Sequence, residues 1–510
     1  MNLAQTQAVV IGALVVFGII MAAIGVYSWR KTQTIEGFLL GSRNIGSWVS
    51  AFCYGTAYFS AVIFVGYAGK HGWNIGIGSI WIGIGNAVLG CWLAWRLLAK
   101  RTRSMTHTLL SRTMPEFFET RYAAKGLKIM SALIIFIFLV PYSAAVYTGL
   151  GNMFHVIFPN VSVTVWMAVI AVLTAFYLIL GGYVAAAYTD FVQGIIMIVG
   201  VIAMVIAITT HPSVGGFGEL WSRLSAIGDN GDGITGAQIT SVFGGNSWKF
   251  LCTNILLTSF GTWGLPQMVS KYYAIKDDRS IKTATIVSTG FALIIGCGAY
   301  FVGSLSRLVL NNKLPEGGVD FVIPQTLLTA LGDSNVLTTV ILAIILLLLL
   351  SASMSTLSSI VLSSSSAISV DLIPEVKKNY KANDQMWITR GLCLVFVGLS
   401  FLFAIKKFSF IVNIMSFSWG VVSGCFIGPY LWGIYSKKTT KAAAYAGMIS
   451  GLLVVGLPTL IMTISSGFQS AAAKAPELGV TAMAVSIIIV PLVSCFTKKF
   501  DEKHLKSVFK

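Results

Sequence analysis

The sequence predicts an all-α integral membrane protein with about 13 transmembrane helices, because its apolar residues form long blocks and its charged residues are few. Of the 510 residues, 56% are hydrophobic and 10% are charged, and the mean hydropathy is +0.82. A soluble domain carries about 25% charged residues. A transmembrane β-barrel would instead alternate apolar and polar residues over segments of about 10 residues. Residues 340–350 contain no polar side chain, so they do not alternate.

Thirteen apolar spans are expected, each long enough to cross roughly 30 Å of hydrocarbon as a helix. The first begins near the N-terminus, but no basic residue precedes it and no small-residue cleavage site follows it. It is therefore interpreted as a true span and not as a signal peptide. In chain order the expected spans are 6–28, 47–69, 76–98, 129–154, 161–181, 189–209, 248–269, 284–309, 337–365, 387–405, 409–435, 440–465 and 478–497.

The net charge of +17 is interpreted as a topology signal and not as a nucleic-acid-binding surface. With the N-terminus outside, 27 of the 35 lysines and arginines fall in cytoplasmic loops or at the cytoplasmic ends of spans. An odd number of spans then places the C-terminus in the cytoplasm. We therefore expect a multi-pass protein of the plasma membrane, as in a bacterial inner membrane, whose basic residues contact at most lipid headgroups.

Two external loops are long. Residues 210–247 are expected to carry a short surface helix around Phe217 to Leu224, and residues 310–335 contain two prolines. Both loops are compatible with lids over a site and with segments that only pack on the bundle.

One acidic residue, Asp190, is expected inside the membrane, where charge is costly and usually functional. It lies at the cytoplasmic start of a span and has no lysine or arginine within twenty residues along the chain. A carboxylate at a helix N-terminus is favoured by the helix dipole, which is one explanation of its position. The other explanation is that Asp190 binds a cation.

The span 337–365 carries a face of small and hydroxyl residues. Ala352, Ser355, Thr356 and Ser359 follow the spacing i, i+3, i+4, i+7, so they share one side of a helix. Hard cations such as sodium are bound by several oxygen ligands, which hydroxyls and freed carbonyls supply. Small residues also line close helix interfaces in lipid, so the face is compatible with packing alone.

Two spans carry breaks at corresponding positions. The second contains Gly55–Ser60, and the seventh contains Gly261–Pro266. Interrupted helices in matching places of two halves indicate an inverted repeat with a binding site near the membrane midplane.

With these features the sequence resembles the sodium:solute symporter family, and most closely its sodium/proline symporter branch. The similarity runs over about residues 10–460 and is carried by Leu40–Asn44, Gly181–Gln193, Gly264–Gln267 and Met354–Ser358. The pairing of Gly-Gly with Thr-Asp-x-x-Gln is the most specific of these motifs.

The resemblance implies a core of two inverted repeats of five spans each, 47–209 and 248–435. Residues 1–46 then hold an extra helix and a cytoplasmic loop, and 210–247 form the external loop between the repeats. Residues 436–510 hold two further helices and a cytoplasmic tail.

The resemblance also implies one sodium site, and in some family members a second. The ligands of the first site would be the carbonyls of Thr56, Phe59 and Ala352 and the hydroxyls of Ser355 and Thr356. The second site, if present, would be formed by Asp190, Ser355, Ser358 and Ser359.

The positions that match the family's solute site are Tyr58, Ser60, Tyr142, Thr258, Thr262, Trp263 and Gln267. The proline branch has an acidic residue where this chain has Tyr58, and a tryptophan where it has Thr258. The resemblance therefore leaves the solute open among amino acids such as proline, sugars and related polar metabolites.

Together these features predict a sodium-coupled symporter that imports a small organic solute by alternating access. Its expected partners are the solute, sodium and the lipid bilayer, with no cofactor beyond sodium ions. A proton-coupled symporter on the same fold, relying on Asp190, and a sensor that does not transport are the alternatives. An enzyme is not expected, because the five histidines show no HxxxH or HExxH spacing and the seven cysteines are scattered without a CxxC.

Overall fold

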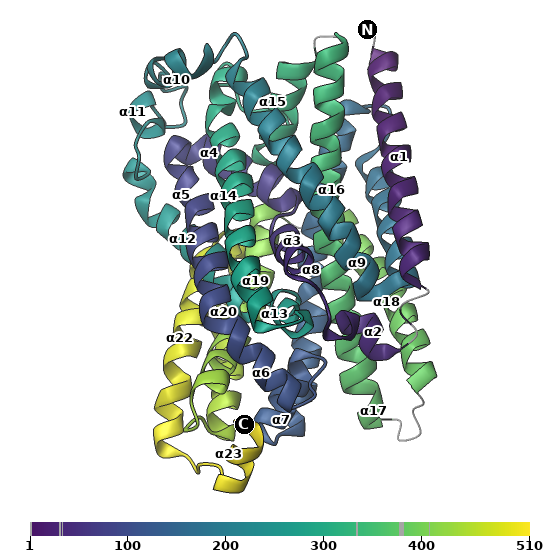
Figure 1. Cartoon of the computed structure of the whole chain (residues 1–510). Coiled ribbons are helices and arrows are strands. Elements are labelled where there is room, and N and C mark those ends of the chain that lie inside the picture. Colours follow the sequence, from purple (N-terminus) through teal and green to yellow (C-terminus); the bar gives the residue numbers. More distant parts are fainter. Residues whose placement is uncertain are drawn as a thin grey trace.

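The computed structural model describes residues 3–29, 32, 34–332, 335–376, 382–406 and 409–509, and throughout these residues the chain folds into an elongated bundle of helices (Figure 1). Helix α1 begins at one end of the bundle, and the short helix α23 (Glu502–Val508) lies at the other end. Of the basic residues assigned above to the cytoplasmic side, six lie outside the described residues: Arg30, Lys31, Lys377, Lys378, Lys381 and Lys510.

Long helices occupy most of the predicted spans, which confirms the all-α fold class. They are α1 (Leu3–Trp29), α8 (Lys125–Ile157), α9 (Val163–Thr209), α14 (Asp278–Val309), α16 (Val336–Ser366), α18 (Ala382–Ile405), α19 (Ile411–Tyr435), α20 (Lys441–Ser466) and α22 (Ala475–Phe496). The shorter helices include α2 (Ile35–Leu40), α7 (Met114–Tyr122), α10 (Gly216–Ser225), α11 (Gly236–Ile239), α15 (Val322–Leu331), α17 (Ile373–Val376) and α21 (Phe468–Ala473).

Within the described residues, ten helical stretches are long and apolar enough to cross a membrane. Two of the predicted spans are interrupted by breaks, so neither forms one long helix. The apolar stretch Val163–Phe176 lies in the predicted span 161–181 and belongs to the long helix α9. The count of thirteen stays a prediction.

Both predicted helix breaks are present. Helix α3 (Ser47–Tyr58) ends at Phe59, whose backbone is extended (φ −106°, ψ 112°), and the helix resumes as a π-helical turn at Val62–Ala68. From Val62 helical segments follow one another to Thr108, through α4 (Gly69–Ile75), a turn at Gly76 (φ 76°, ψ −143°), α5 (Ile80–Gly85) and α6 (Lys100–Thr108).

The second break separates α12 (Trp248–Gly264) from α13 (Pro266–Ala274). Leu265 is extended (φ −78°, ψ 122°), because a residue before proline is pushed out of the helical region.

Helix α9 joins two predicted spans through a single turn at Gly182. This residue has φ 52° and ψ −141°, and a Cβ atom there would lie 2.5 Å from a ring carbon of Phe38. Only glycine fits such a position. The predicted connection 182–188 is otherwise helical, and Asp190 follows in the second half of α9.

The core lies where α16 packs along α9 and α3, and where α8, α20 and α22 surround α19. The broken helix α3 is thereby enclosed by α9, α13, α14 and α16. This packing brings the first break against the hydroxyl-rich part of α16.

The loop 210–247 carries the predicted surface helix as α10, and a buried arginine ties the loop to the bundle. Arg307 on α14 is 1% exposed. It donates to the Trp73 carbonyl at 2.8 Å, to Asn312 Oδ1 at 2.5 Å and to Asp232 Oδ2 at 2.6 Å. Asp232 belongs to the loop, so this part of it is anchored by a buried cation.

Arg307→Met is expected to destabilise the protein by about 1–3 kcal/mol, since it leaves the Trp73 carbonyl without its donor and releases Asp232. The measurement is the unfolding midpoint together with the rate of proteolysis within 210–247. Arg223→Met is the matched control, because Arg223 makes an exposed i,i+4 pair with Glu219 in the same loop. Such a pair contributes about 0–1 kcal/mol. Equal effects of the two substitutions would contradict the anchoring role of Arg307.

Candidate sodium and solute sites

Four of the five oxygens predicted for the first sodium site lie together between the break of α3 and the middle of α16. The Ser355 hydroxyl lies within hydrogen-bonding distance of two carbonyl oxygens, that of Thr56 at 2.9 Å and that of Ala352 at 3.1 Å. The Thr356 hydroxyl donates to the Ala352 carbonyl at 3.0 Å and lies 3.4 Å from the Thr56 carbonyl. All four residues are fully buried. The structure therefore gathers carbonyl and hydroxyl oxygens, the ligand type that sodium uses.

The fifth predicted ligand, Phe59, is the residue at which α3 ends. Its N–H donates to the Gly55 carbonyl at 3.3 Å, which closes the last turn of the helix. Because its backbone is extended, its own carbonyl leaves the direction of the helix axis. The Ala57 carbonyl is a further acceptor within reach of the Thr356 hydroxyl, at 3.2 Å, and the sequence pattern did not single out this oxygen.

A serine outside the predicted set also bridges the break. The Ser353 hydroxyl accepts a hydrogen bond from the Ala61 N–H at 3.0 Å, on the other side of the interruption from Thr56. Two neighbouring parts of α16 thus bind both sides of the break in α3. The hydroxyl-rich face of α16 therefore holds the broken helix α3 in place and also presents oxygens to a cation.

Asp190 is fully buried, and neither of its carboxylate oxygens has a hydrogen-bond partner among the described residues. The nearest cation is Lys271 on α13, whose Nζ lies 3.9 Å from Asp190 Oδ2 and donates to Ser359 Oγ at 3.0 Å. Lys271 is one of the 27 basic residues expected on the cytoplasmic side, yet it is only 2% exposed. Asp190 therefore has a cationic neighbour that its sequence surroundings do not contain.

The other two residues predicted for a second sodium site are engaged elsewhere. Ser358 donates to the Ser355 carbonyl at 2.9 Å, and Ser355 donates towards the break of α3. Among the described residues, no group of three or more His, Cys, Asp or Glu side chains is placed to hold a metal ion.

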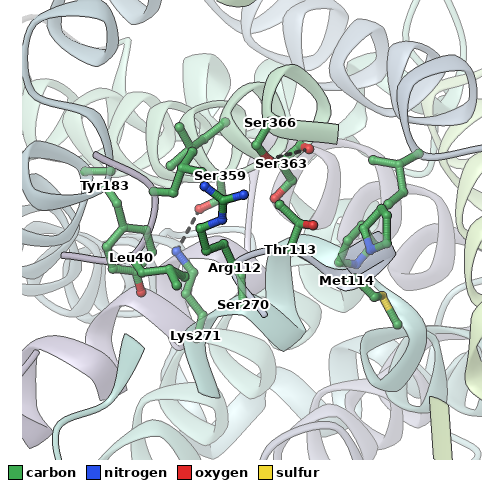
Figure 2. Close-up of a pocket in the computed structure, with 16 residues that line it drawn as sticks. Leu40, Arg112, Thr113, Met114, Tyr183, Ser270, Lys271, Ser359, Ser363 and Ser366 are labelled. Atoms are coloured by element: carbon green, nitrogen blue, oxygen red, sulfur yellow. Dashed lines mark hydrogen bonds between the residues drawn. The ribbon is translucent and has the colours of Figure 1, made fainter. Parts of the chain in front are cut away.

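A cleft beside Lys271 is lined by residues of α2, α7, α9, α13 and α16 (Figure 2). Its walls include Lys271 and Ser359, which Figure 2 shows joined by their hydrogen bond, and Ser363, Ser366 and Thr113. The polar wall therefore continues along α16 from Ser359 to Ser366, away from the buried ion pair.

The predicted solute residues are brought close to the breaks, and all of them are buried. The Tyr58 hydroxyl donates to the Thr258 carbonyl at 2.7 Å, and the Thr258 hydroxyl donates to Asn86 Oδ1 at 2.7 Å. The Thr262 hydroxyl lies 3.3 Å from the Gly90 carbonyl, and Trp263 Nε1 donates to the Leu89 carbonyl at 3.1 Å. These side chains form one network between α12 and the helix of residues 86–93.

Three further predicted residues lie around this network. The ring of Tyr142 packs edge-on against Trp419 at 5.7 Å between ring centres, and Trp419 also contacts the ring of Tyr58 at 6.3 Å. The Ser60 hydroxyl accepts from the Val62 N–H at 3.2 Å. The Gln267 amide oxygen and nitrogen are buried without a hydrogen-bond partner in the described part of the chain. Unpaired polar groups of this kind are available to a polar solute.

Sequence reasoning missed two residues of this region, Asn86 and Trp419. Asn86 lies in an apolar span with no motif around it, and Trp419 lies in a helix that the family pattern did not mark. A polar residue in an otherwise apolar span is a signal that could have identified Asn86.

Comparison with known proteins assigns the family. The sequence profile of the sodium:solute symporter family matches residues 38–451. The chain belongs to this family. As a symporter it is a sodium-coupled solute transporter of the membrane and not an enzyme, which confirms the expected class.

Relatives of this symporter include bacterial proline transporters. It is 27% identical to the osmoregulated proline transporter OpuE of Bacillus subtilis, over 96% of this chain and 95% of the relative. It is 28% identical to the sodium/proline symporter of Escherichia coli, over 88% of this chain and 87% of the relative. The likeness to the proline branch is confirmed at this level of identity.

Solved structures show the fold of the symporter. A sialic acid symporter in a substrate-bound outward-open state aligns over 98% of this chain and 99% of that chain, with a TM-score of 0.77 and 18% identity. The nucleobase-cation-symport transporter Mhp1 in a closed conformation aligns over 92% of this chain and 97% of that chain, with a TM-score of 0.51 and 14% identity. At these identities the comparisons establish the architecture alone.

Proposed function

We propose that this symporter imports a small amino acid of the proline class together with sodium, by alternating access. The observation that carries the proposal is the group of oxygens from Thr56, Ala352, Ser355 and Thr356, which joins the broken helix α3 to α16. The names of the bacterial relatives support an amino-acid solute, and the polar network around Tyr58 and Thr258 offers hydrogen bonds without a charged residue.

A sodium ion bound by these oxygens would hold α3 and α16 together. Bound between α3 and α16, it holds the break in the shape that completes the solute network beside it. When α3 and α16 separate, the cation loses several ligands at once and leaves. The two broken helices thus couple one binding event to the other.

The driving force suffices for accumulation. One sodium ion moving down a tenfold gradient supplies about 1.4 kcal/mol. A membrane potential of 100 mV adds about 2.3 kcal/mol per charge. Together they support solute accumulation of about several hundredfold for each co-transported sodium.

The test is uptake of labelled proline into proteoliposomes that hold the purified protein, with an inward sodium gradient or with potassium at equal ionic strength. Sodium-dependent uptake that excess unlabelled proline blocks is the expected result. Sodium-dependent uptake blocked by another amino acid, or by a sugar, would reassign the solute and keep the coupling. Uptake without sodium that an inward proton gradient stimulates would overturn sodium coupling and favour the proton-coupled alternative.

A further inference from the structure

The buried pair of Asp190 and Lys271 is not used by the sodium site described above. Asp190 is 0% exposed and Lys271 is 2% exposed, and 3.9 Å separate Asp190 Oδ2 from Lys271 Nζ. The ammonium also donates to Ser359 Oγ at 3.0 Å and lies 5.0 Å from the ring centre of Tyr183. A buried charge needs a partner, so each of the two charged groups requires the other.

The oxygens that surround this ammonium are a cation site by composition. Two of the four residues expected to hold a second sodium, Asp190 and Ser359, already lie around Lys271 Nζ. The aromatic face of Tyr183 is a further group that attracts a cation. The site is therefore filled by a positive charge that the chain itself supplies.

A sodium ion at the same oxygens would share one carboxylate with the ammonium. The described residues place no second acidic group within ion-pairing distance of Lys271, so the added charge would be uncompensated in a buried place. Repulsion between two like charges is strong there, because the surroundings screen it poorly. Sodium and the Lys271 ammonium exclude each other from Asp190.

The position of Lys271 along the cleft gives a second reason. Lys271 and Ser359 both line the cleft, whose walls also include residues of α2 and α7, and in Figure 2 the two side chains meet at its wall. Asp190 itself is not among the residues that line the cleft. A sodium ion that approached Asp190 from this side would meet the ammonium first.

We propose that Lys271 is a built-in cation that occupies the second cation site, so that this symporter binds a single sodium ion, at Thr56, Ala352, Ser355 and Thr356. This inference rests on the proposed function, since it assumes sodium binding at the first site. It assigns Lys271 as the residue that sets the number of coupled sodium ions.

The experiment counts bound sodium on the purified full-length protein by equilibrium binding of radioactive sodium, which requires no solute. Wild type is expected to bind one sodium per chain, and Thr356→Ala is expected to bind none. Lys271→Met is expected to bind a second sodium, with a Hill coefficient above one if the two ions bind cooperatively. The double substitution Asp190→Asn and Lys271→Met is expected to return the count to one.

Lys271→Arg is the matched control, because it keeps the charge at the same place and is expected to leave the count at one. Two sodium ions in wild type, or one remaining in Thr356→Ala, would overturn the proposal, and neither result depends on the folding of a Lys271 variant. No sodium in wild type would overturn the first site and with it the proposed function, whereas two would overturn only the role of Lys271.

Discussion

Thr356→Ala is expected to abolish the sodium-specific stabilisation of the purified protein. Saturating sodium stabilises a folded protein by about 2.7 kcal/mol when its concentration is a hundred times the dissociation constant. The Thr356 hydroxyl lies 3.0 Å from the Ala352 carbonyl and 3.2 Å from the Ala57 carbonyl, so its removal takes one oxygen from the centre of the group. The measurement is the unfolding midpoint in sodium and in potassium at equal ionic strength.

Two control variants separate loss of a ligand from loss of packing. Thr356→Ser keeps the hydroxyl and is expected to keep most of the sodium effect. Thr326→Ala removes the same atoms from another buried threonine, whose hydroxyl donates to the Val322 carbonyl at 2.7 Å on α15. Thr326→Ala is expected to lower both midpoints equally. A sodium-specific shift of wild-type size in Thr356→Ala would exclude this hydroxyl as a ligand.

Gly303→Ala is expected to destabilise the bundle by about 1–3 kcal/mol, the usual cost of overpacking a core. A Cβ atom at Gly303 on α14 would lie 2.0 Å from the Ala68 carbonyl oxygen, which is backbone and has no rotamer to change. The contact is mutual, because a Cβ at Gly72 on α4 would lie 2.1 Å from the Gly303 carbonyl carbon. Helix α14 and the segment that runs from Val62–Ala68 into α4 must therefore separate to admit the methyl group.

The same substitution at Gly290 is the control, since this glycine lies on the same helix and a Cβ there meets no atom within 4 Å. Gly290→Ala is expected to stabilise the helix slightly, by about 0.5–1 kcal/mol. The unfolding midpoints of the two variants, compared in one detergent, measure the difference. Equal unfolding midpoints of the two variants would show that the close approach of α4 and α14 does not contribute to the stability of the protein.

Local features of the sequence determined the fold class, one of the helix breaks and the face of α16 that carries ligands of the first sodium site. The apolar blocks predicted the long helices, because burial in lipid depends on composition over about 20 residues. Pro266 predicted the break after α12, since its ring excludes the helical conformation of the residue before it. The spacing of Ala352, Ser355 and Thr356 placed them on one face of α16, as the helical repeat requires.

The partners of those residues were decided by the tertiary structure. The sequence marked Asp190 as a charge without a neighbour, whereas folding places Lys271 beside it from the far side of the second break. The contact of Thr258 with Asn86 likewise joins residues from different helices. The physical reason is that a helical repeat fixes which residues share a face, whereas electrostatic and hydrogen-bond partners in a buried site depend on which faces meet when the helices pack.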